Sequence, residues 1–447
     1  MKMLWKHRAA IVFLLVGLGL GFILSGHVVT NVSAIPREDY ESLETFTNIL
    51  SIVRKNYVED VNAKDLISGA INGMLNGLDP HSAYLTPDLY KELQADTQGR
   101  FGGLGIEITA RNGVLTVVSP IEDTPAYRAG VKAGDQIIKI EDDFTKDMSL
   151  MEAVKRMRGN KGSKVTIAIK REGVPELMNF TLVRDVIRVQ SVRSRVLEEG
   201  YGYIRLAQFQ ERTDRDLQRA LEKFGQEKGG LKGLVLDMRN NPGGLLTQAV
   251  RVTDLFLDSG MIVYTDGRLE SQKQKYFAHK EGSWTGFPIV VLVNAGSASA
   301  SEIVAGALQD HKRALILGTK TFGKGSVQTI LPLDDSSALR LTTARYFTPK
   351  GRSIQASGIV PDIIVENTSP PDAKGDDRKR PVVREENLPG HLQNQQAPQE
   401  SKDKDKEKEA ERPVPPMSEM TPENDAQLRR ALELLKGLDM FKQVMNK

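Results

Sequence analysis

Residues 289–302 read IVVLVNAGSASASE, a buried strand followed by a run of small residues and then a helix. The five apolar residues at the start of this stretch are typical of a strand that is covered on both faces. Similar strands alternate with helices from Gly202 to Leu317. This alternation predicts an α/β core built on a largely parallel sheet.

A second stretch, Thr321-Phe-Gly-Lys-Gly-Ser326, follows about one strand–helix unit later and carries a lysine between two glycines. Together the two stretches suggest a peptidase with a serine nucleophile and a lysine base. Lysine acts as a base only if its pKa falls from about 10.4 to near 7, which burial can supply. The nearest sequence neighbours of Lys324 carry no charge, which fits a lowered pKa. The alternative is that this lysine between two glycines is an ordinary loop-tip residue.

Three serines of the first stretch are candidates for the nucleophile: Ser297, Ser299 and Ser301. A serine at a strand-to-helix junction lies beside free helix amides, which can bind an oxyanion. Ser301, directly before Glu302, also suits a helix N-cap. The small residues on both sides of Ser299 leave room for a peptide substrate.

Further amides for an oxyanion hole are offered by the segment from Asp237 to Gly244. It ends the preceding apolar strand, and Gly243 and Gly244 then open a helix. The same glycines also fit an ordinary helix-start turn. The glycine spacing of a dinucleotide or phosphate loop is absent.

Histidine is the usual base of a serine peptidase, and the chain has six histidines. Three lie in the leader region or in a polar segment near the C-terminus. His81, His279 and His311 are better explained as surface or capping residues. No histidine cluster has metal-ligand spacing and the chain has no cysteine, so we expect no metal site and no cofactor.

The N-terminus predicts export from the cytoplasm. Lys2, Lys6 and Arg8 precede an apolar run from Ala9 to Leu24, which is shorter than the ~20 residues of a comfortable membrane span. Val32-Ser-Ala34 resembles a signal-peptidase site. We expect a periplasmic protein with a cleaved leader, the alternative being retention of this segment as an inner-membrane anchor. The net charge of +3 over 447 residues gives no reason to expect nucleic-acid binding.

Several of these segments are similar to the bacterial carboxy-terminal processing proteases, also called tail-specific proteases, over almost the whole chain. The matching segments are Leu78–Ser82, Gly102–Ile106, Pro125–Ala126, Ala129–Gly130, Gly134–Asp135, Arg158–Gly159, Asp237–Gly244, Ser297–Glu302 and Phe322–Gln328. Their number and order make the resemblance far more specific than any one of them.

The resemblance assigns roles to particular residues. It implies that Ser299 is the nucleophile, that Lys324 is its base, and that Gln328 orients the lysine. Ala300, with Gly243 or Gly244, would supply the oxyanion amides.

The resemblance also implies that the strands after residue 101 form a PDZ domain. The loop Gly103-Leu104-Gly105-Ile106 would then bind the terminal carboxylate of a peptide. Arg158, at the C-terminal side of the helical part of this domain, is a candidate link between occupancy of this groove and the active site, the alternative being a solvated surface arginine.

The expected fold is α/β multidomain, with a PDZ domain ahead of a crotonase/Clp-like protease core and flanking helices at both ends. The expected segments are a leader (1–34), an N-terminal helical region (35–98), a PDZ domain (99–185), a protease core (186–368), a disordered linker (369–416) and a C-terminal helix (417–447). The apolar stripe of this last helix is expected to contact another subunit or a partner protein.

The expected function is an exported endopeptidase with a Ser–Lys dyad, whose PDZ domain recognises C-terminal tails or gates the active site. The alternative is a PDZ adaptor that binds tails without cutting them. The expected partners are proteins or peptides with accessible C-terminal tails, further copies of the chain in a dimer or larger homo-oligomer, and an activating adaptor.

Overall fold

A computed structural model describes residues 37–111, 114–121, 123–146, 148–227, 229–366, 380–396, 410–411 and 420–445. The chain divides into two units, Met1–Ile71 and Asn72–Lys447. The predicted leader, residues 1–34, lies outside the described residues. Within those ranges no helix has the length and apolar character needed to cross a membrane.

The first unit contains helix α2 (Arg37–Asn56) and the start of α3 (Ala63–Asn76), both within the region expected to be helical. None of the residues of α2 is buried. The apolar stripe of α2, which includes Leu43, Phe46 and Ile49, is exposed to solvent. A helix with an uncovered apolar stripe has a surface available for association.

In the second unit, the end of α3 is followed by strand β1 (Ala83–Leu85) and helix α4 (Pro87–Gln98). The ends of α4 follow its sequence: Thr86 accepts a hydrogen bond from the Leu89 amide at 3.5 Å, and Gly99 ends the helix in the left-handed conformation. The chain then enters β2 (Arg100–Gly103), which pairs with β9 (Asp185–Arg188). A small domain is therefore inserted through one two-stranded ribbon.

The small domain is an antiparallel sheet in the order β3-β4-β5-β7-β8, with β6 paired to β5. The domain also contains helix α6 (Leu150–Met157). A separate apolar core, which includes Ile137, Ile167 and Ile169, stabilises this domain. Its other elements are β3 (Ile106–Arg111), β4 (Val114–Pro120), α5 (Pro125–Arg128), β5 (Gln136–Ile140), β6 (Asp143–Phe144), β7 (Lys164–Lys170) and β8 (Met178–Val183).

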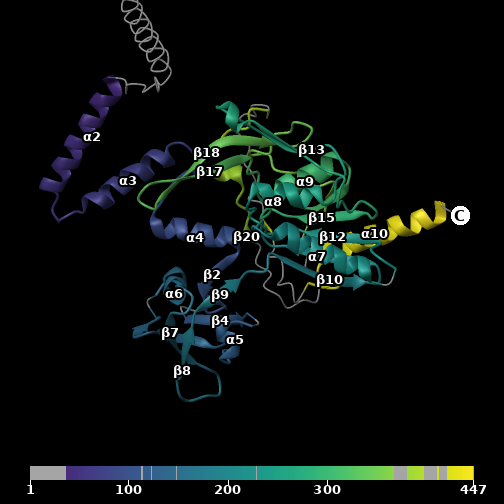
Figure 1. The fold of residues 1–447 in the computed structure, drawn as a ribbon, viewed down its shortest axis with the longest axis horizontal. Helices are drawn as coiled ribbons and strands as arrows, with labels where there is room; N and C mark the ends of the chain where they lie inside the picture. Colours follow the sequence, from purple (N-terminus) through teal and green to yellow (C-terminus); the bar gives the residue numbers. More distant parts are fainter. Residues whose placement is uncertain are drawn as a thin grey trace, which may run out of the picture. The chain divides into compact units, whose positions relative to one another are not determined.

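The α/β core is a six-stranded sheet in the order β10-β11-β12-β15-β16-β19. Its strands β10, β12 and β15 are labelled in Figure 1. All neighbouring strands are parallel except β10 and β11, which confirms the largely parallel sheet. The five residues of β15 are all buried, as their unbroken apolar sequence predicts. The strands are β10 (Val192–Glu198), β11 (Tyr201–Leu206), β12 (Gly233–Asp237), β15 (Ile289–Val293), β16 (Ala314–Gly318) and β19 (Ile363–Ile364).

Helices cover both faces of this sheet. The larger core cluster includes residues of α7 (Thr213–Gln226), α8 (Leu246–Asp254) and α9 (Ala300–Asp310). The other cluster includes residues of the C-terminal helix α10 (Ala426–Met445).

The position of α10 corrects the expectation that its apolar stripe needs a partner subunit. Leu428, Leu432 and Leu435 are buried against the sheet of the same chain. A fully buried leucine contributes roughly 1.5–3 kcal/mol relative to an exposed one, so this contact is a substantial part of the core. The helix begins at Ala426 and is capped by Asp425, which accepts from the Leu428 amide at 3.0 Å.

A second, antiparallel sheet was not predicted. Its order is β1-β18-β13-β14, and β17 pairs with β18. Most residues of β17 and β18 are only half-buried. The sequences of these two strands therefore lack the continuous apolar run by which the core strands were recognised. The loop that carries Lys324 runs directly into β17. The elements are β13 (Met261–Gly267), η1 (Glu270–Gln272), β14 (Gln274–Phe277), β17 (Ser326–Pro332) and β18 (Ala338–Phe347).

Part of the predicted disordered linker is ordered. Residues 380–396 contain η2 (Glu385–Asn387), and Glu385 is fully buried. β20 (Arg380–Pro381) pairs with β21 (Ala410–Glu411). The prediction of disorder throughout 369–416 is wrong for 380–396, because specific hydrogen bonds hold a segment whose composition alone cannot form a core.

Candidate active site

Ser299 lies where β15 is joined to α9, in an unusual backbone conformation. Its φ of 56° and ψ of −112° are rare for a residue with a side chain, and such strain costs of order 1–3 kcal/mol. Ser299, and not Ser301, occupies the N-cap position, yet its hydroxyl makes no capping hydrogen bond.

The two neighbouring serines are tied to the backbone. The Ser297 hydroxyl donates to the Met238 carbonyl at 2.8 Å, and the Ser301 hydroxyl donates to the Asn241 carbonyl at 2.9 Å. Both residues are fully buried. Of the three candidates, Ser299 is therefore the serine whose hydroxyl is not used to hold a main-chain carbonyl.

The carboxylate of Glu302 holds the backbone of Ser299 and of Lys324 together. One oxygen, Oε2, accepts from the Ser299 amide at 2.7 Å and from the Lys324 amide at 2.9 Å. The other, Oε1, accepts from the Thr321 hydroxyl and from the Gly323 amide. Burial raises the pKa of Glu302 to about 7, while these four donors favour its ionised form. The sequence shows Glu302 only as a helix-start residue, because its partners are distant along the chain.

The Lys324 side chain lies in a mostly buried position that lowers its pKa. Burial is the main cause, and the positive charge of Arg340 adds to it. Glu385, Asp79 and Glu302 raise the pKa without reversing the shift. The environment thus lowers the pKa of Lys324, as a lysine base requires. The charged groups near Lys324 in the fold are distant in sequence, so its sequence neighbours do not reveal them.

Tyr346 is a further residue that sequence reasoning missed. This buried tyrosine on β18 donates from its phenol to the Lys324 carbonyl and lies within hydrogen-bond reach of the Ser299 side chain. It therefore touches both candidate dyad residues. No sequence signal distinguishes it from the other aromatic residues of the strands.

The structure places Gly243 against Ser299. A Cβ at Gly243 would come within 2.8 Å of the Ser299 Cβ, and the φ of Gly243 is +102°, so only glycine fits. The Gly243 amide, however, donates to the Asn241 side chain at 2.9 Å. Within the described ranges, the amides of Ala300 and Gly244 have no hydrogen-bond acceptor. Of the three amides predicted for an oxyanion hole, those of Ala300 and Gly244 are therefore without an acceptor and that of Gly243 is not.

Gln328 is not hydrogen-bonded to Lys324. Its side-chain amide donates to the hydroxyls of Ser326 at 3.0 Å and Thr342 at 3.2 Å. Between these described residues there is also no hydrogen bond from the Lys324 amine to the Ser299 hydroxyl. The structure thus brings the main chains of the dyad residues together but does not join their side chains.

The histidines occupy structural positions. His81 binds the buried carboxylate of Glu385 at 2.8 Å. The exposed His279 contacts Asp254, and His311 contacts the Met261 carbonyl. None of these three histidines is hydrogen-bonded to Ser299.

The small domain contains an apolar groove of about 180 Å³ between β3 and α6. The loop Gly103–Ile106 closes one end, and Ile106, Leu150 and Val154 line its sides. The carbonyls of Leu104 and Gly105 accept hydrogen bonds from within the domain, whereas their amides have no acceptor among the described residues. Free amides at the end of an apolar groove suit the terminal carboxylate of an extended peptide.

Arg158 lines this groove and also contacts helix α4. Its guanidinium stacks on the Phe101 ring at 4.4 Å and donates to Glu92 at 3.0 Å. A second acid of α4, Asp96, lies 3.9 Å away. Arg158 therefore links the groove to the helix that precedes the ribbon between the small domain and the core.

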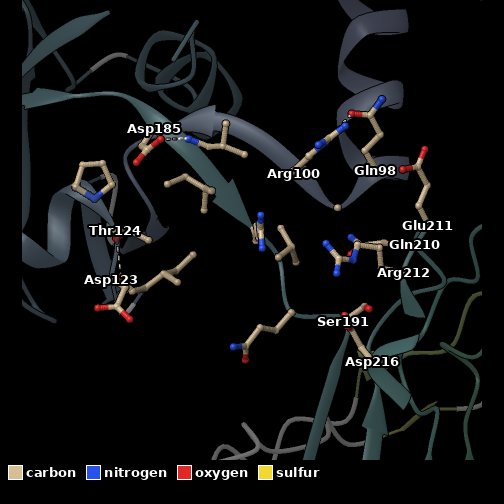
Figure 2. Close-up of a pocket in the computed structure, with 18 of the residues that line it drawn as sticks. Gln98, Arg100, Asp123, Thr124, Asp185, Ser191, Gln210, Glu211, Arg212 and Asp216 are labelled. Atoms are coloured by element: carbon tan, nitrogen blue, oxygen red, sulfur yellow. Dashed lines mark hydrogen bonds between the residues drawn. The ribbon is translucent and has the colours of Figure 1, made fainter. Parts of the chain in front are cut away.

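A larger cavity, of about 480 Å³, lies beside this ribbon. Figure 2 shows Asp123, Thr124 and Asp185 on one side of it and Arg100, Arg212 and Ser191 on the other. Ser299 and Lys324 do not line it. The cavity therefore marks the junction of the small domain with the core and not the candidate catalytic centre.

Three family models match the chain. The peptidase family S41 matches residues 200–365, and the PDZ domain matches residues 102–194. The N-terminal domain of the activating protease CtpB matches residues 25–88. The two larger matches correspond to the α/β core and the small inserted domain, which confirms the predicted fold class.

The chain is also similar to curated proteins. It is 46% identical over 425 residues to a carboxy-terminal-processing protease of Bartonella bacilliformis, covering 93% of this chain and 94% of the relative. It is 38% identical to the carboxy-terminal processing protease CtpA of Bacillus subtilis, covering 70% and 67%. A solved photosystem II D1 C-terminal processing protease is 32% identical, with a TM-score of 0.43 and coverage of 72% and 92%.

Proposed function

Because this chain belongs to the carboxy-terminal processing proteases, which are serine proteases of family S41, we propose that it cuts protein substrates with a Ser299–Lys324 dyad. The observation that carries the proposal is the Glu302 carboxylate, one oxygen of which holds both backbone amides. The PDZ domain captures the C-terminal tail of the substrate.

In the proposed mechanism, the Ser299 hydroxyl attacks the scissile carbonyl while neutral Lys324 removes its proton. The amides of Ala300 and Gly244 then stabilise the oxyanion. Lys324 returns the proton to the leaving amine, and water releases the acyl group from Ser299. Gln328 orients Lys324 only after a side-chain rearrangement, since it now contacts Ser326 and Thr342.

Tail recognition is tested with one peptide made in two forms, with a free C-terminal carboxylate and with an amide. We expect kcat/KM to be about 10- to 100-fold lower for the amidated form, because hydrogen bonds to a charged group contribute roughly 1.5–3 kcal/mol. Equal cleavage of both forms would show that the tail is not recognised. Tail binding without cleavage under any condition would favour the silent adaptor.

Coupling through Arg158 is tested with Arg158→Ala. We expect the rate advantage of the free tail over the amidated tail to fall by about tenfold, because the contact between the groove and α4 is lost. Arg156→Ala is the matched control, since Arg156 lies two positions before Arg158, in α6, but pairs with Asp143 and Glu152 within the PDZ domain. If both variants behave alike, the coupling role is wrong.

The proposal also includes export and assembly. Export to the periplasm is supported by the leader sequence, and N-terminal sequencing of the mature protein distinguishes a cleaved leader from an anchor.

Assembly is supported by the exposed stripe of α2 and by exposed Met440, Phe441 and Val444 at the end of α10. A monomer in light scattering would contradict a homo-oligomer. An activating adaptor would bind through one of these surfaces.

A further inference from the structure

Residues 384–396 pass over the two loops that surround Lys324, and we call this segment the strap. The Arg384 guanidinium donates to the Thr321 carbonyl at 2.9 Å and to the Lys320 carbonyl. The Glu385 amide donates to the Phe322 carbonyl at 3.0 Å. The strap therefore binds the main chain immediately before Gly323 and Lys324.

The strap also holds the loop of residues 351–358. The Gln355 side chain donates to the Leu392 carbonyl at 3.0 Å, and Asn394 donates to the Ser357 hydroxyl at 2.5 Å. Further along, the Gln396 side chain accepts from the Ser353 amide at 2.7 Å. These polar contacts explain how a segment poor in large apolar residues is fixed in place.

Glu385 occupies the centre of these contacts. Its carboxylate accepts from His81 at 2.8 Å and from the Gln355 side chain at 2.9 Å. The oxygen of the same Gln355 side chain accepts from the Gly325 amide at 3.0 Å. A Cβ at Gly325 would lie 2.4 Å from the backbone nitrogen of Gln355, so the loop that carries Lys324 is in close contact with the loop of residues 351–358. A chain of hydrogen bonds thus leads from Glu385 to the residue that follows Lys324.

The residues on both sides of Lys324 are therefore held by buried carboxylates. Glu302 accepts directly from the Gly323 amide, and Glu385 holds Gly325 through Gln355. We propose that Glu385 is a positioning residue of the active site, and that the strap delivers it to fix the loop that carries Lys324. This inference rests on the proposed role of Lys324 as the base.

The charge of Glu385 adds a second effect. Burial opposes its ionisation, but the hydrogen bonds from His81 and Gln355 outweigh burial and lower the pKa of Glu385. The resulting negative charge raises the pKa of Lys324, as do those of Asp79 and Glu302, whereas burial and Arg340 lower it. Tyr346 also faces this site through the Lys324 carbonyl. Loss of the Glu385 charge should lower the pKa of Lys324.

Two substitutions separate position from charge. Glu385→Gln keeps the shape and an oxygen for the Gln355 amide, so we expect kcat at its plateau to stay within about threefold. The acid limb of kcat/KM against pH should move to lower pH, because neutral Lys324 then forms more readily. Glu385→Ala removes the anchor of Gln355, and we expect plateau kcat to fall by about 10- to 100-fold through misplacement of the base.

Glu386→Gln is the matched control, because the adjacent Glu386 pairs with Lys320 in a partly exposed position. Its pH profile and kcat should match those of the unchanged full-length protein. Binding of a tail peptide to the PDZ domain and the melting temperature report whether each variant folds. If Glu385→Ala does not fold, the dependence of kcat/KM on pH in Glu385→Gln still shows whether Glu385 acts on Lys324.

An unshifted acid limb in Glu385→Gln would overturn the inference. Unchanged kcat in a folded Glu385→Ala variant would also overturn it. Either result leaves the proposed function standing, provided that cleavage still requires Lys324. Cleavage that persists without Lys324 would instead contradict the proposed dyad.

Discussion

Ser299→Ala is expected to lower kcat for peptide cleavage by about 10⁴- to 10⁶-fold, because removal of a serine nucleophile costs on this order in other serine peptidases. The expected cause is chemical and not structural. The Ser299 hydroxyl makes no capping hydrogen bond, and the Glu302 carboxylate accepts from the backbone amide, which alanine retains. The variant should therefore fold and bind a tail peptide as the unchanged protein does.

Ser301→Ala is the matched control for this prediction. Its hydroxyl holds the Asn241 carbonyl, so the variant should lose about 1 kcal/mol of unfolding free energy but still cleave. Cleavage by Ser299→Ala at more than a hundredth of the normal rate would contradict the assignment. Loss of cleavage in Ser301→Ala but not in Ser299→Ala would instead assign the nucleophile to Ser301.

Lys324→Ala is expected to produce a loss of similar size. Since a nucleophile and its base act as a unit, the Ser299→Ala/Lys324→Ala double variant should be little worse than either single variant. If the loss in the double variant equals the product of the two single losses, the two residues act independently. Single-turnover assays with a peptide that carries a free C-terminal carboxylate measure these rates.

Lys324→Met distinguishes loss of the base from loss of the fold. Burial lowers the pKa of Lys324 in the folded state, so the unfolded chain binds more protons at this site. The contribution of this lysine to stability therefore rises with pH across the window between the lowered pKa and the ordinary value of about 10.4. At neutral pH, an apolar methionine should keep or raise the melting temperature while cleavage is lost. Lower stability would contradict this reasoning.

The sequence predicted what depends on local pattern. The apolar run of β15 identified a strand buried on both faces. The small residues around Ser299 predicted room for a peptide substrate, which stays a prediction. The resemblance then selected Ser299 and Lys324 from several candidates. It also identified the PDZ domain, which local patterns showed only as short strands with glycines.

What the sequence could not show depends on contacts between distant residues. Glu302 stands in the most informative stretch, but its partners Gly323 and Lys324 lie 21 and 22 positions away. Glu385 stands in a polar segment that predicts disorder, and its carboxylate contacts His81, 304 positions away. No local pattern predicts that Tyr346, on a half-buried strand, contacts the Lys324 carbonyl.

The most direct test of the dyad is kcat/KM against pH for Lys324→Arg. Arginine keeps the positive charge and the length of the side chain, but it cannot be deprotonated in a protein. If Lys324 is the base, the unchanged protein should gain activity as pH rises through the lowered pKa of this lysine, and Lys324→Arg should be inactive at every pH. Cleavage by Lys324→Arg within about tenfold of normal would show that Lys324 contributes only charge.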